Sequence, residues 1–145
     1  MKILVLGASG ATGKLVLKRL LDKRIETKII VRDPSKISDS HRNCGFLECI
    51  TGNITGLEHY EFLSLVSGCD GVISCLGHNI TLKGVFGEPK MLVTDTLKKI
   101  CEAIVTNGQE RTKLVLMNTT ANRNNGIGEK YGLPDRVVLS LLYRL

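Results

Sequence analysis

Short apolar runs alternate along this chain with longer amphipathic or polar stretches. The five runs lie at residues 3–6, 27–31, 46–50, 72–76 and 113–117. A short, β-branched-rich run that ends at glycine or polar residues is typical of a strand buried on both faces of a sheet. Five such strands alternating with helical patterns predict an α/β fold, in which a doubly wound parallel sheet has the strand order 3-2-1-4-5.

The stretches between these runs carry apolar residues at helical spacing. Residues 15–23 predict a first helix, whose apolar side is formed by Leu15, Val16, Leu17, Leu20 and Leu21. Residues 57–66 predict a short helix, and the polar residues 38–45 predict a loop. A long amphipathic helix is predicted from Val93, Leu97, Ile100, Cys101 and Ile104. Asn107-Gly108 would end that helix in the manner of a C-cap.

The C-terminal part of the sequence is less regular. Residues 80–89 and 122–134 are polar and contain glycine, which predicts loops, and the first of these could border a substrate. Residues 136–145 are apolar nearly all round, and such a helix needs burial. We therefore expect one domain over residues 1–145 that is either the N-terminal part of a longer protein, truncated at its C-terminus, or a chain that buries this helix in a partner such as a second copy.

Composition narrows the class of protein. The 145 residues can bury a sizeable core, and no apolar run reaches membrane-spanning length. A strand is predicted from residue 3, so we expect no signal peptide and a cytoplasmic location. The net charge of +6 is spread along the chain and suits an anionic, phosphate-bearing ligand. Aromatic residues are few and no nucleic-acid-binding module is recognised, so nucleic acid is not an expected partner.

The cysteine and histidine residues indicate neither disulfides nor a metal site. Five cysteines occur without a C-x-x-C pair, and the sequence favours buried, reduced thiols. Two of them lie in the third and fourth apolar runs, and Cys101 lies on the apolar stripe of the long helix. The three histidines do not combine with cysteines at metal-ligand spacing.

Three glycines follow the first apolar run, in the stretch Gly7-Ala8-Ser9-Gly10-Ala11-Thr12-Gly13. A strand, a glycine turn and a helix in this order form the phosphate-binding corner of a dinucleotide fold. Gly7 allows the sharp turn, Gly10 lets a pyrophosphate approach the backbone, and Gly13 lets the helix pack closely. The helix start adds free N–H groups, and Ser9 and Thr12 add hydroxyl donors. The alternative is a plain tight turn, since glycine-rich turns are common.

The end of the second predicted strand bears on the choice of cofactor. Sites that prefer NAD usually place an acidic residue there to hold the ribose 2′-hydroxyl, but here the first residue is Arg32. A guanidinium can grip a 2′-phosphate with two parallel bonds, and Lys36 could assist. One such bond contributes roughly 1.5–3 kcal/mol, or about tenfold to a hundredfold in preference for NADP. Asp33 would bind a 2′-hydroxyl instead if the strand ended one residue later, and Arg32 would then be a solvated loop cation.

Catalytic candidates are few. His78 follows the fourth predicted strand, at the sheet edge where open α/β folds bind their ligands. A lone loop histidine is more often solvated and inert. Asn118-Thr119-Thr120-Ala121 follows the fifth predicted strand at the same edge.

These motifs together give the chain a family resemblance. The sequence resembles the atypical short-chain dehydrogenase/reductase superfamily, which has a Rossmann-like fold, and within it the NAD(P)H-binding branch of NmrA-like proteins and biliverdin reductase B/flavin reductases. The resemblance covers residues 1 to about 121. Its motifs are the glycine turn, residues 31–36, Gly52-Asn53-Ile54, residues 70–77 and residues 118–121. They are specific for the superfamily but not for a substrate.

The resemblance implies roles for single residues. Arg32 would bind the 2′-phosphate, and Leu76-Gly77 would lie along the cofactor toward the nicotinamide ribose. Asn53 stands where the family usually has Asp beside the adenine, and Thr120 where the flavin reductases have a Ser near the nicotinamide. The expected cofactor-binding residues are Gly7, Ser9, Gly10, Ala11, Thr12, Gly13, Arg32, Lys36, Asn53, Ile54, Leu76, Gly77, Thr119 and Thr120. Thr120 and His78 are the weak catalytic candidates.

One departure from the superfamily concerns catalysis. The wider superfamily uses a Tyr-x-x-x-Lys pair, in which the lysine lowers the pKa of the tyrosine. Here Tyr60 is followed by Ser64 and Tyr131 by Asp135, and two residues after Tyr143 the sequence ends. We therefore expect an NADPH-dependent reductase that transfers hydride to a flavin-like or other conjugated acceptor, a reaction that needs positioning more than a protein base. The alternative is a non-catalytic, NmrA-like redox sensor that binds NADP(H) and a protein partner. A sugar epimerase would also need the tyrosine.

Overall fold

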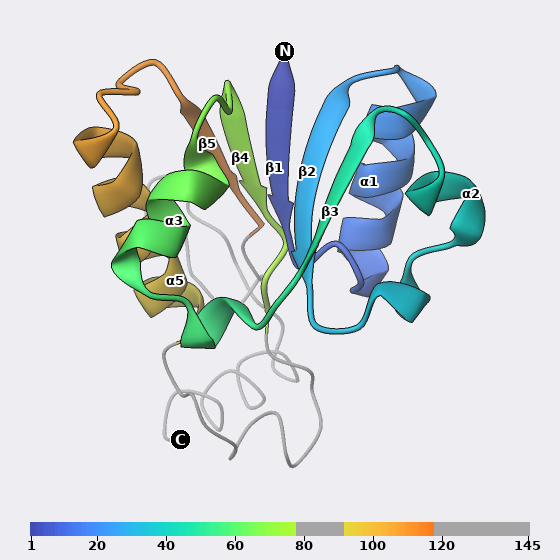
Figure 1. The fold of residues 1–145 in the computed structure, drawn as a ribbon, viewed down its shortest axis with the longest axis horizontal. Helices are drawn as coiled ribbons and strands as arrows, with labels where there is room; N and C mark the ends of the chain where they lie inside the picture. The colour runs from blue at the N-terminus through green and yellow to red at the C-terminus, as the bar shows by residue number, and fades with distance from the viewer. Residues whose placement is uncertain (78–91, 118–145) are drawn as a thin grey trace, which may run out of the picture.

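The computed structural model describes residues 1–77 and 92–117, which form a parallel sheet between two layers of helices (Figure 1). The strands are β1 (Lys2–Leu6), β2 (Glu26–Val31), β3 (Leu47–Thr51), β4 (Gly71–Ser74) and β5 (Lys113–Leu116). Their order is β3-β2-β1-β4-β5, and every neighbouring pair is parallel. The structure confirms the predicted α/β class and strand order.

The helices cover both faces of this sheet. They are α1 (Ala11–Asp22), α2 (Asp39–Arg42), α3 (His59–Val66) and α5 (Leu92–Thr106), with single 3-10 turns η1 (Pro34–Lys36) and η2 (Ile54–Gly56). Figure 1 shows α1 and α2 on one side of the sheet and α3 and α5 on the other. No helix of the described ranges is long and apolar enough to cross a membrane.

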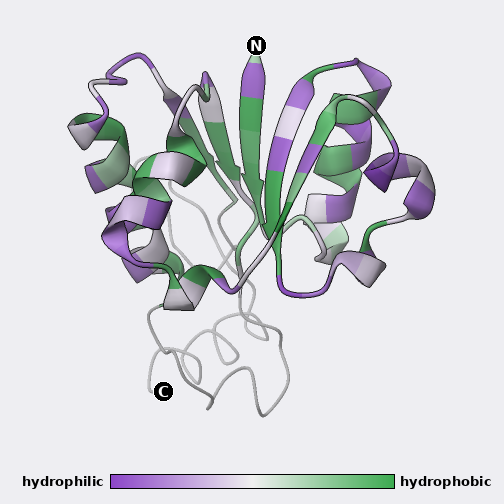
Figure 2. Cartoon of the chain, in the orientation of Figure 1, coloured by the Kyte–Doolittle hydropathy of each residue, from purple (hydrophilic) through white to green (hydrophobic). Residues whose placement is uncertain are grey.

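Each face of the sheet has its own apolar core, and Figure 2 shows hydrophobic residues along the strands and on parts of the helices that cover them. Under α1, Leu17 and Leu21 pack with Val5 and Ile29. Under α3 and α5, the core is formed by Leu4, Leu6, Val72, Phe62, Leu65, Ile100 and Ala103. Leu4, Val5 and Leu6 of β1 are fully buried, because this strand lies between β2 and β4 and under helices on both faces. The prediction of a first strand buried on both faces is confirmed.

Two apolar side chains do not lie where the sequence pattern placed them. Leu15 is 67% exposed, although it was assigned to the apolar side of the first helix. The buried stripe of α1 is Gly13, Leu17 and Leu21, and a helix turns about 100° per residue, so Leu15 lies on the opposite face from Leu17. Cys101 is exposed for the same reason, since it lies a quarter turn beyond the buried Ile100. The prediction of a buried thiol is wrong for Cys101.

Some predicted boundaries also move. The predicted loop at residues 38–45 contains α2, a single helical turn in which Arg42 pairs with Asp39. The third strand begins and ends one residue later than predicted, and the fourth ends at Ser74 rather than residue 76. The predicted end of the long helix is confirmed, because Gly108 has φ +65° and its N–H bonds the Val105 carbonyl.

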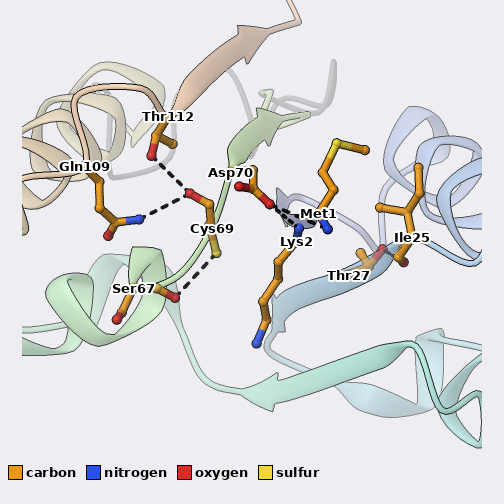
Figure 3. A network of polar contacts seen from close by, with 9 residues as sticks. All are labelled: Met1, Lys2, Ile25, Thr27, Ser67, Cys69, Asp70, Gln109 and Thr112. Atoms are coloured by element: carbon orange, nitrogen blue, oxygen red, sulfur yellow. Dashed lines mark hydrogen bonds and ion pairs between the residues drawn. The ribbon is translucent and has the colours of Figure 1, made fainter.

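The amino end of the sheet is held by side chains (Figure 3). The carbonyl of Cys69 accepts hydrogen bonds from Gln109 Nε2 at 3.2 Å and from Thr112 Oγ1 at 3.0 Å. The carboxylate of Asp70 accepts the Lys2 N–H at 2.7 Å and lies 3.8 Å from the Met1 ammonium. These bonds join the start of β4 to β1 and to the turn that precedes β5.

A second set of polar side chains crosses the same end of the sheet on the α3 face. Lys2 Nζ lies 2.7 Å from Glu48 Oε2, and Lys28 Nζ lies 3.7 Å from Glu48 Oε1. The Lys28 side chain is nearly buried and also donates to the Ser64 carbonyl at 3.3 Å. This ladder of Lys2, Lys28 and Glu48 joins strands β1, β2 and β3.

The remaining expectations fall outside the described residues. These are the loops at residues 80–89 and 122–134, the apolar helix at residues 136–145, and the candidates His78, Thr119 and Thr120.

Candidate functional site

A cleft of about 280 Å³ opens at the carboxyl ends of the central strands. This is the edge of the sheet at which open α/β folds bind their ligands. The cleft is lined by Leu6, Gly7, Ser9, Ile30, Val31, Arg32, Gly52, Asn53, Ile54, Thr55, Leu76 and Leu92. These residues come from the ends of β1, β2, β3 and β4 and from the first residue of α5.

Gly7 begins the turn that leads from β1 to α1. Its φ of +73° lies in the left-handed region that favours glycine. A Cβ at this position would also lie 2.7 Å from the Cys75 carbonyl oxygen. Both the conformation and the space therefore require glycine at residue 7.

Gly13 lies in the first turn of α1 and is buried. A Cβ here would lie 2.0 Å from the Gly7 carbonyl oxygen and 2.8 Å from Ala8 Cα. The absent side chain thus lets the helix start contact the backbone of the turn. The sequence predicted close packing of this helix, and the structure shows that the contacted partner is the turn itself.

Gly10 is the N-cap of α1 and forms no side-chain cap. Its carbonyl accepts the Lys14 N–H at 2.9 Å. The first turn carries no acidic residue, so no carboxylate competes there for the amides of Ala11, Thr12 and Gly13. A helix start with uncapped N–H groups suits a phosphate.

Arg32 and Asp33 follow β2, which ends at Val31. Arg32 is exposed and lines the cleft. Asp33 instead caps η1: its Oδ1 accepts the Ser35 hydroxyl at 2.6 Å and the Ser35 N–H at 3.0 Å. These two bonds lower the pKa of Asp33. The strand therefore ends where the sequence placed it, and the carboxylate beside Arg32 is already engaged.

Lys36 does not join Arg32 in the cleft. It lines a neighbouring groove on the outer side of α1, together with Lys14 and His41. Asn53 and Ile54 do line the cleft, and Asn53 Oδ1 accepts the Thr55 N–H at 3.4 Å as the cap of η2. Thr55 and Leu92 were missed by the sequence reasoning. Thr55 directly follows the Gly52-Asn53-Ile54 motif, whereas nothing local marks Leu92.

Leu76 lines the cleft, and Gly77 follows it near the end of β5, where an added Cβ would lie 3.7 Å from Met117 Cε. The nearby Cys75 thiol is buried, and burial raises its pKa. Ser74, at the end of β4, is fully buried, and its Oγ has no hydrogen-bond partner in the described part of the chain.

Residues 1–77 and 92–117 hold no group of His, Cys, Asp and Glu side chains that could bind a metal ion. Tyr60 lies on α3 and is 68% exposed. It does not line the cleft.

Comparison with known proteins identifies the family. A sequence model described as NAD(P)H-binding matches residues 7–131, most of the chain. The chain belongs to the NAD(P)H-binding family. This match confirms the predicted NAD(P)H-binding family, and the structural neighbours confirm the predicted Rossmann-like fold. No curated protein sequence matches the chain.

Solved structures of other proteins share the fold of this NAD(P)H-binding chain. The oxidoreductase ylbE from Lactococcus lactis is 17% identical with a TM-score of 0.65, over 98% of this chain and 59% of its own. Isoflavone reductase is 20% identical with a TM-score of 0.61, and the match covers 99% of this chain and 43% of the reductase. A short-chain dehydrogenase/reductase from Veillonella parvula in complex with NADP is 13% identical with a TM-score of 0.63. This match covers 83% of this chain and 48% of the other protein. This chain thus spans about half the length of the structures it resembles.

Proposed function

We propose that this NAD(P)H-binding protein prefers NADP(H) and acts as an NADPH-dependent reductase on a flavin-like or other conjugated acceptor. The observation that carries the cofactor preference is the position of Arg32, which lines the same cleft as the glycine turn. Among the described residues that line this cleft, Arg32 is the only charged one. A 2′-phosphate entering the cleft would therefore meet a cation and no carboxylate.

The position of Asp33 supports the same preference. Its Oδ1 accepts both bonds from Ser35, and it does not line the cleft. A ribose 2′-hydroxyl in the cleft would therefore meet a carboxylate that lies outside the lining and whose Oδ1 already accepts two bonds. A guanidinium binds a phosphate through two parallel charge-assisted bonds, so Arg32 favours the phosphorylated ribose.

The glycine turn fits the shared part of the cofactor. The turn and the start of α1 lie in direct contact because Gly7 and Gly13 have no side chains. A Cβ at residue 13 would lie 2.0 Å from the Gly7 carbonyl oxygen. A pyrophosphate could then accept hydrogen bonds from the uncapped start of α1 and from Ser9. Asn53 and Ile54 would hold the adenine end, and Leu76 and Gly77 the nicotinamide ribose.

When bound, the cofactor would supply a hydride, and the acceptor would take a proton from water. The chain's own contribution would be to hold the dinucleotide in one orientation, since positioning alone accelerates transfer between two bound reactants. This proposal asks for no protein base, in agreement with the residues found four positions after Tyr60 and Tyr131, which are Ser64 and Asp135 and not lysines.

The cofactor proposal is tested by titrating the protein with NADPH and NADH and following fluorescence. We expect micromolar NADPH binding and at least about tenfold weaker NADH binding, from one charge-assisted bond. Arg32→Gln should weaken NADPH binding about tenfold to a hundredfold and change NADH binding little. Arg19→Gln removes an equal charge from the surface of α1 and should change neither. Equal affinities for the two nucleotides, or equal effects of the two substitutions, would refute the NADP preference.

The reductase proposal has its own test. NADPH oxidation is followed with flavins, biliverdin and quinones as acceptors, in the wild type and in Arg32→Gln at subsaturating NADPH. Acceptor-dependent oxidation that falls with Arg32→Gln would support the reductase. No oxidation with any acceptor, while NADPH still binds, would exclude it for this panel.

The second candidate is a redox sensor that binds NADP(H) without catalysis. It is favoured by Tyr60, the one tyrosine among the described residues, which is 68% exposed and does not line the cleft. A sensor requires a partner whose affinity differs between NADPH and NADP, and equal affinities would exclude it. A cytoplasmic location, which suits either candidate, is open to cell fractionation.

A further inference from the structure

A second cavity, of about 410 Å³, lies between α1, η1 and α2. It shares no lining residue with the cleft at the carboxyl ends of the strands. We call it the basic groove and use six of its residues: Lys14, Leu15 and Lys18 of α1, Lys36 and Ile37 after β2, and His41 of α2.

The basic groove has lysines on both sides, Lys14 and Lys18 on one and Lys36 on the other. Lys14 and Lys18 are one helical turn apart, about 6 Å along α1. Lys36 and His41 come from the opposite side, on η1 and α2. No carboxylate lines the groove among the described residues. Lys18 already pairs with Asp22 at 2.7 Å, whereas Lys14 and Lys36 form no ion pair within the part of the chain that the structure describes.

The groove also offers apolar surface. Leu15 is 67% exposed at its rim, although the rest of the apolar stripe of α1 is turned to the sheet. Ile37 is 2% exposed and closes the floor. The stems of the lysines add further methylene groups beside Leu15. An exposed leucine surrounded by cations is the complement of an apolar side chain flanked by carboxylates.

We propose that the basic groove binds an acidic segment of a partner protein, with one leucine-sized side chain against Leu15 and carboxylates toward Lys14, Lys18 and Lys36. Charge complementarity selects this occupant, because a free phosphate would leave Leu15 uncovered and an apolar peptide would offer Lys14 and Lys36 no carboxylate. This inference does not depend on the proposed cofactor. The loop after β2 nevertheless serves both places, since Arg32 lines the cleft and Lys36 the groove.

The test measures fluorescence anisotropy of a labelled peptide in which a single leucine is flanked by glutamates, at physiological ionic strength. The variant Lys14→Gln/Lys18→Gln is compared with Arg19→Gln/Lys23→Gln, which removes two charges at the same spacing from α1 and its C-cap, outside the groove. We expect about tenfold weaker binding to the first variant and less than about a twofold change with the second. Leu15→Ser and a peptide with serine in place of leucine should each weaken binding severalfold.

Several results would overturn the proposal. These are no binding by the wild type, equal losses in the two double variants, and a serine peptide that binds as well as the leucine peptide. Tighter binding of single-stranded DNA or of anionic lipid vesicles, with the same sensitivity to Lys14→Gln/Lys18→Gln, would assign the groove to another class of partner and also refute it. An NADPH titration of the same samples separates this outcome from failure of the cofactor proposal, and thermal unfolding checks that each variant is folded.

Discussion

The two ends of the parallel sheet are built in opposite ways. At the carboxyl end, the helix start packs directly on the glycine turn, because Gly13 has no side chain between it and the Gly7 carbonyl. Among the described residues that line the cleft, Arg32 is the one that carries a charge. At the amino end, side chains tie the strands together, through Asp70 to β1 and through Glu48 to Lys2 and Lys28. One end is suited to receive a ligand, and the other to hold the strands in register.

This difference suggests that binding and stability can be separated by mutation. Substitutions at the amino end should change the free energy of unfolding and leave nucleotide affinity nearly unchanged, since the two ends share no side-chain contact described above. Substitutions in the glycine turn should change both, because the turn is part of the cleft and is packed against backbone.

Gly13→Ala should have the largest effect. The new Cβ would lie 2.0 Å from the Gly7 carbonyl oxygen, so α1 or the turn must move. Overpacking of this kind costs about 3 kcal/mol of unfolding free energy, and the cofactor corner is displaced with it. Urea unfolding and the NADPH titration measure the two effects. Gly45→Ala is the control, because a Cβ there meets nothing within 4 Å, and a comparable loss with this variant would contradict the explanation.

Glu48→Ala should destabilise the protein without affecting the cleft. The side chain of Lys28 is only 7% exposed, and its Nζ lies 3.7 Å from Glu48 Oε1. After the substitution, Lys28 keeps its hydrogen bond to the Ser64 carbonyl but has lost the carboxylate. Since Glu48 itself is half exposed, the expected loss is about 1–2 kcal/mol, below that for a fully buried pair. Urea unfolding measures it. The double variant Glu48→Ala/Lys28→Met should recover much of this loss, and no recovery would indicate that Lys28 is not the reason.

The same carboxylate should contribute to acid sensitivity. The hydrogen bond from Lys2 lowers the pKa of Glu48 below its ordinary value of 4.5. A depressed carboxyl pKa gives stability that is present above the unfolded value and is lost as pH falls through the folded one. Stability should therefore fall below about pH 4.5. Glu48→Gln should make this fall shallower, and an unchanged pH profile of the unfolding midpoint would refute the assignment.

Ser74→Ala should raise stability by about 1 kcal/mol. The Ser74 hydroxyl is fully buried and lacks a partner among the described residues, and an unsatisfied buried polar group is destabilising. Thermal unfolding measures the gain. The opposite result, a loss of stability, would mean that the hydroxyl has a partner beyond residues 1–77 and 92–117.

Arg24→Gly should give the smallest effect, a gain of about 0.5–1 kcal/mol. Helices α1 and α5 end in the same pattern, in which the N–H of Ile25 bonds the Leu20 carbonyl and that of Gln109 bonds the Ile104 carbonyl. In each motif one residue after the helix has a left-handed backbone conformation. After α5 this residue is Gly108, with φ +65°, and after α1 it is Arg24, with φ +54°. Gly108→Arg should accordingly cost a similar amount, and equal midpoints for both variants and the wild type in urea would contradict this reading.

Much of the fold could be predicted because local signals agreed with the tertiary structure. The run at residues 3–6 predicted a strand buried on both faces, and Leu4, Val5 and Leu6 are fully buried. Gly108 predicted the end of α5 because a helix C-cap of this kind needs a residue with a left-handed backbone, which glycine adopts readily. In the cleft, Gly7, Arg32 and Asn53 could be named because each directly follows a strand or belongs to a short motif.

The misses have physical reasons. Leu15 and Cys101 were placed by hydrophobicity, but the direction of a helical side chain decides its burial. Lys36 was grouped with Arg32 by sequence proximity, whereas η1 turns it toward α1. Leu92 reaches the cleft from a distant part of the chain, and no local pattern reports such a contact. The acceptor and the roles of Thr119 and Thr120 stay predictions.

The central place of β1 has a consequence for how the chain is made. This strand precedes the other four strands of the sheet in the sequence, yet its two neighbours are β2 and β4, and β4 begins only at Gly71. One flank of β1 must therefore stay unpaired while the residues between Leu6 and Gly71 are translated, with a fully apolar stretch at Ile3 to Leu6. During that interval the nascent chain exposes an apolar strand with an unpaired edge, which is a substrate for chaperones that bind apolar segments.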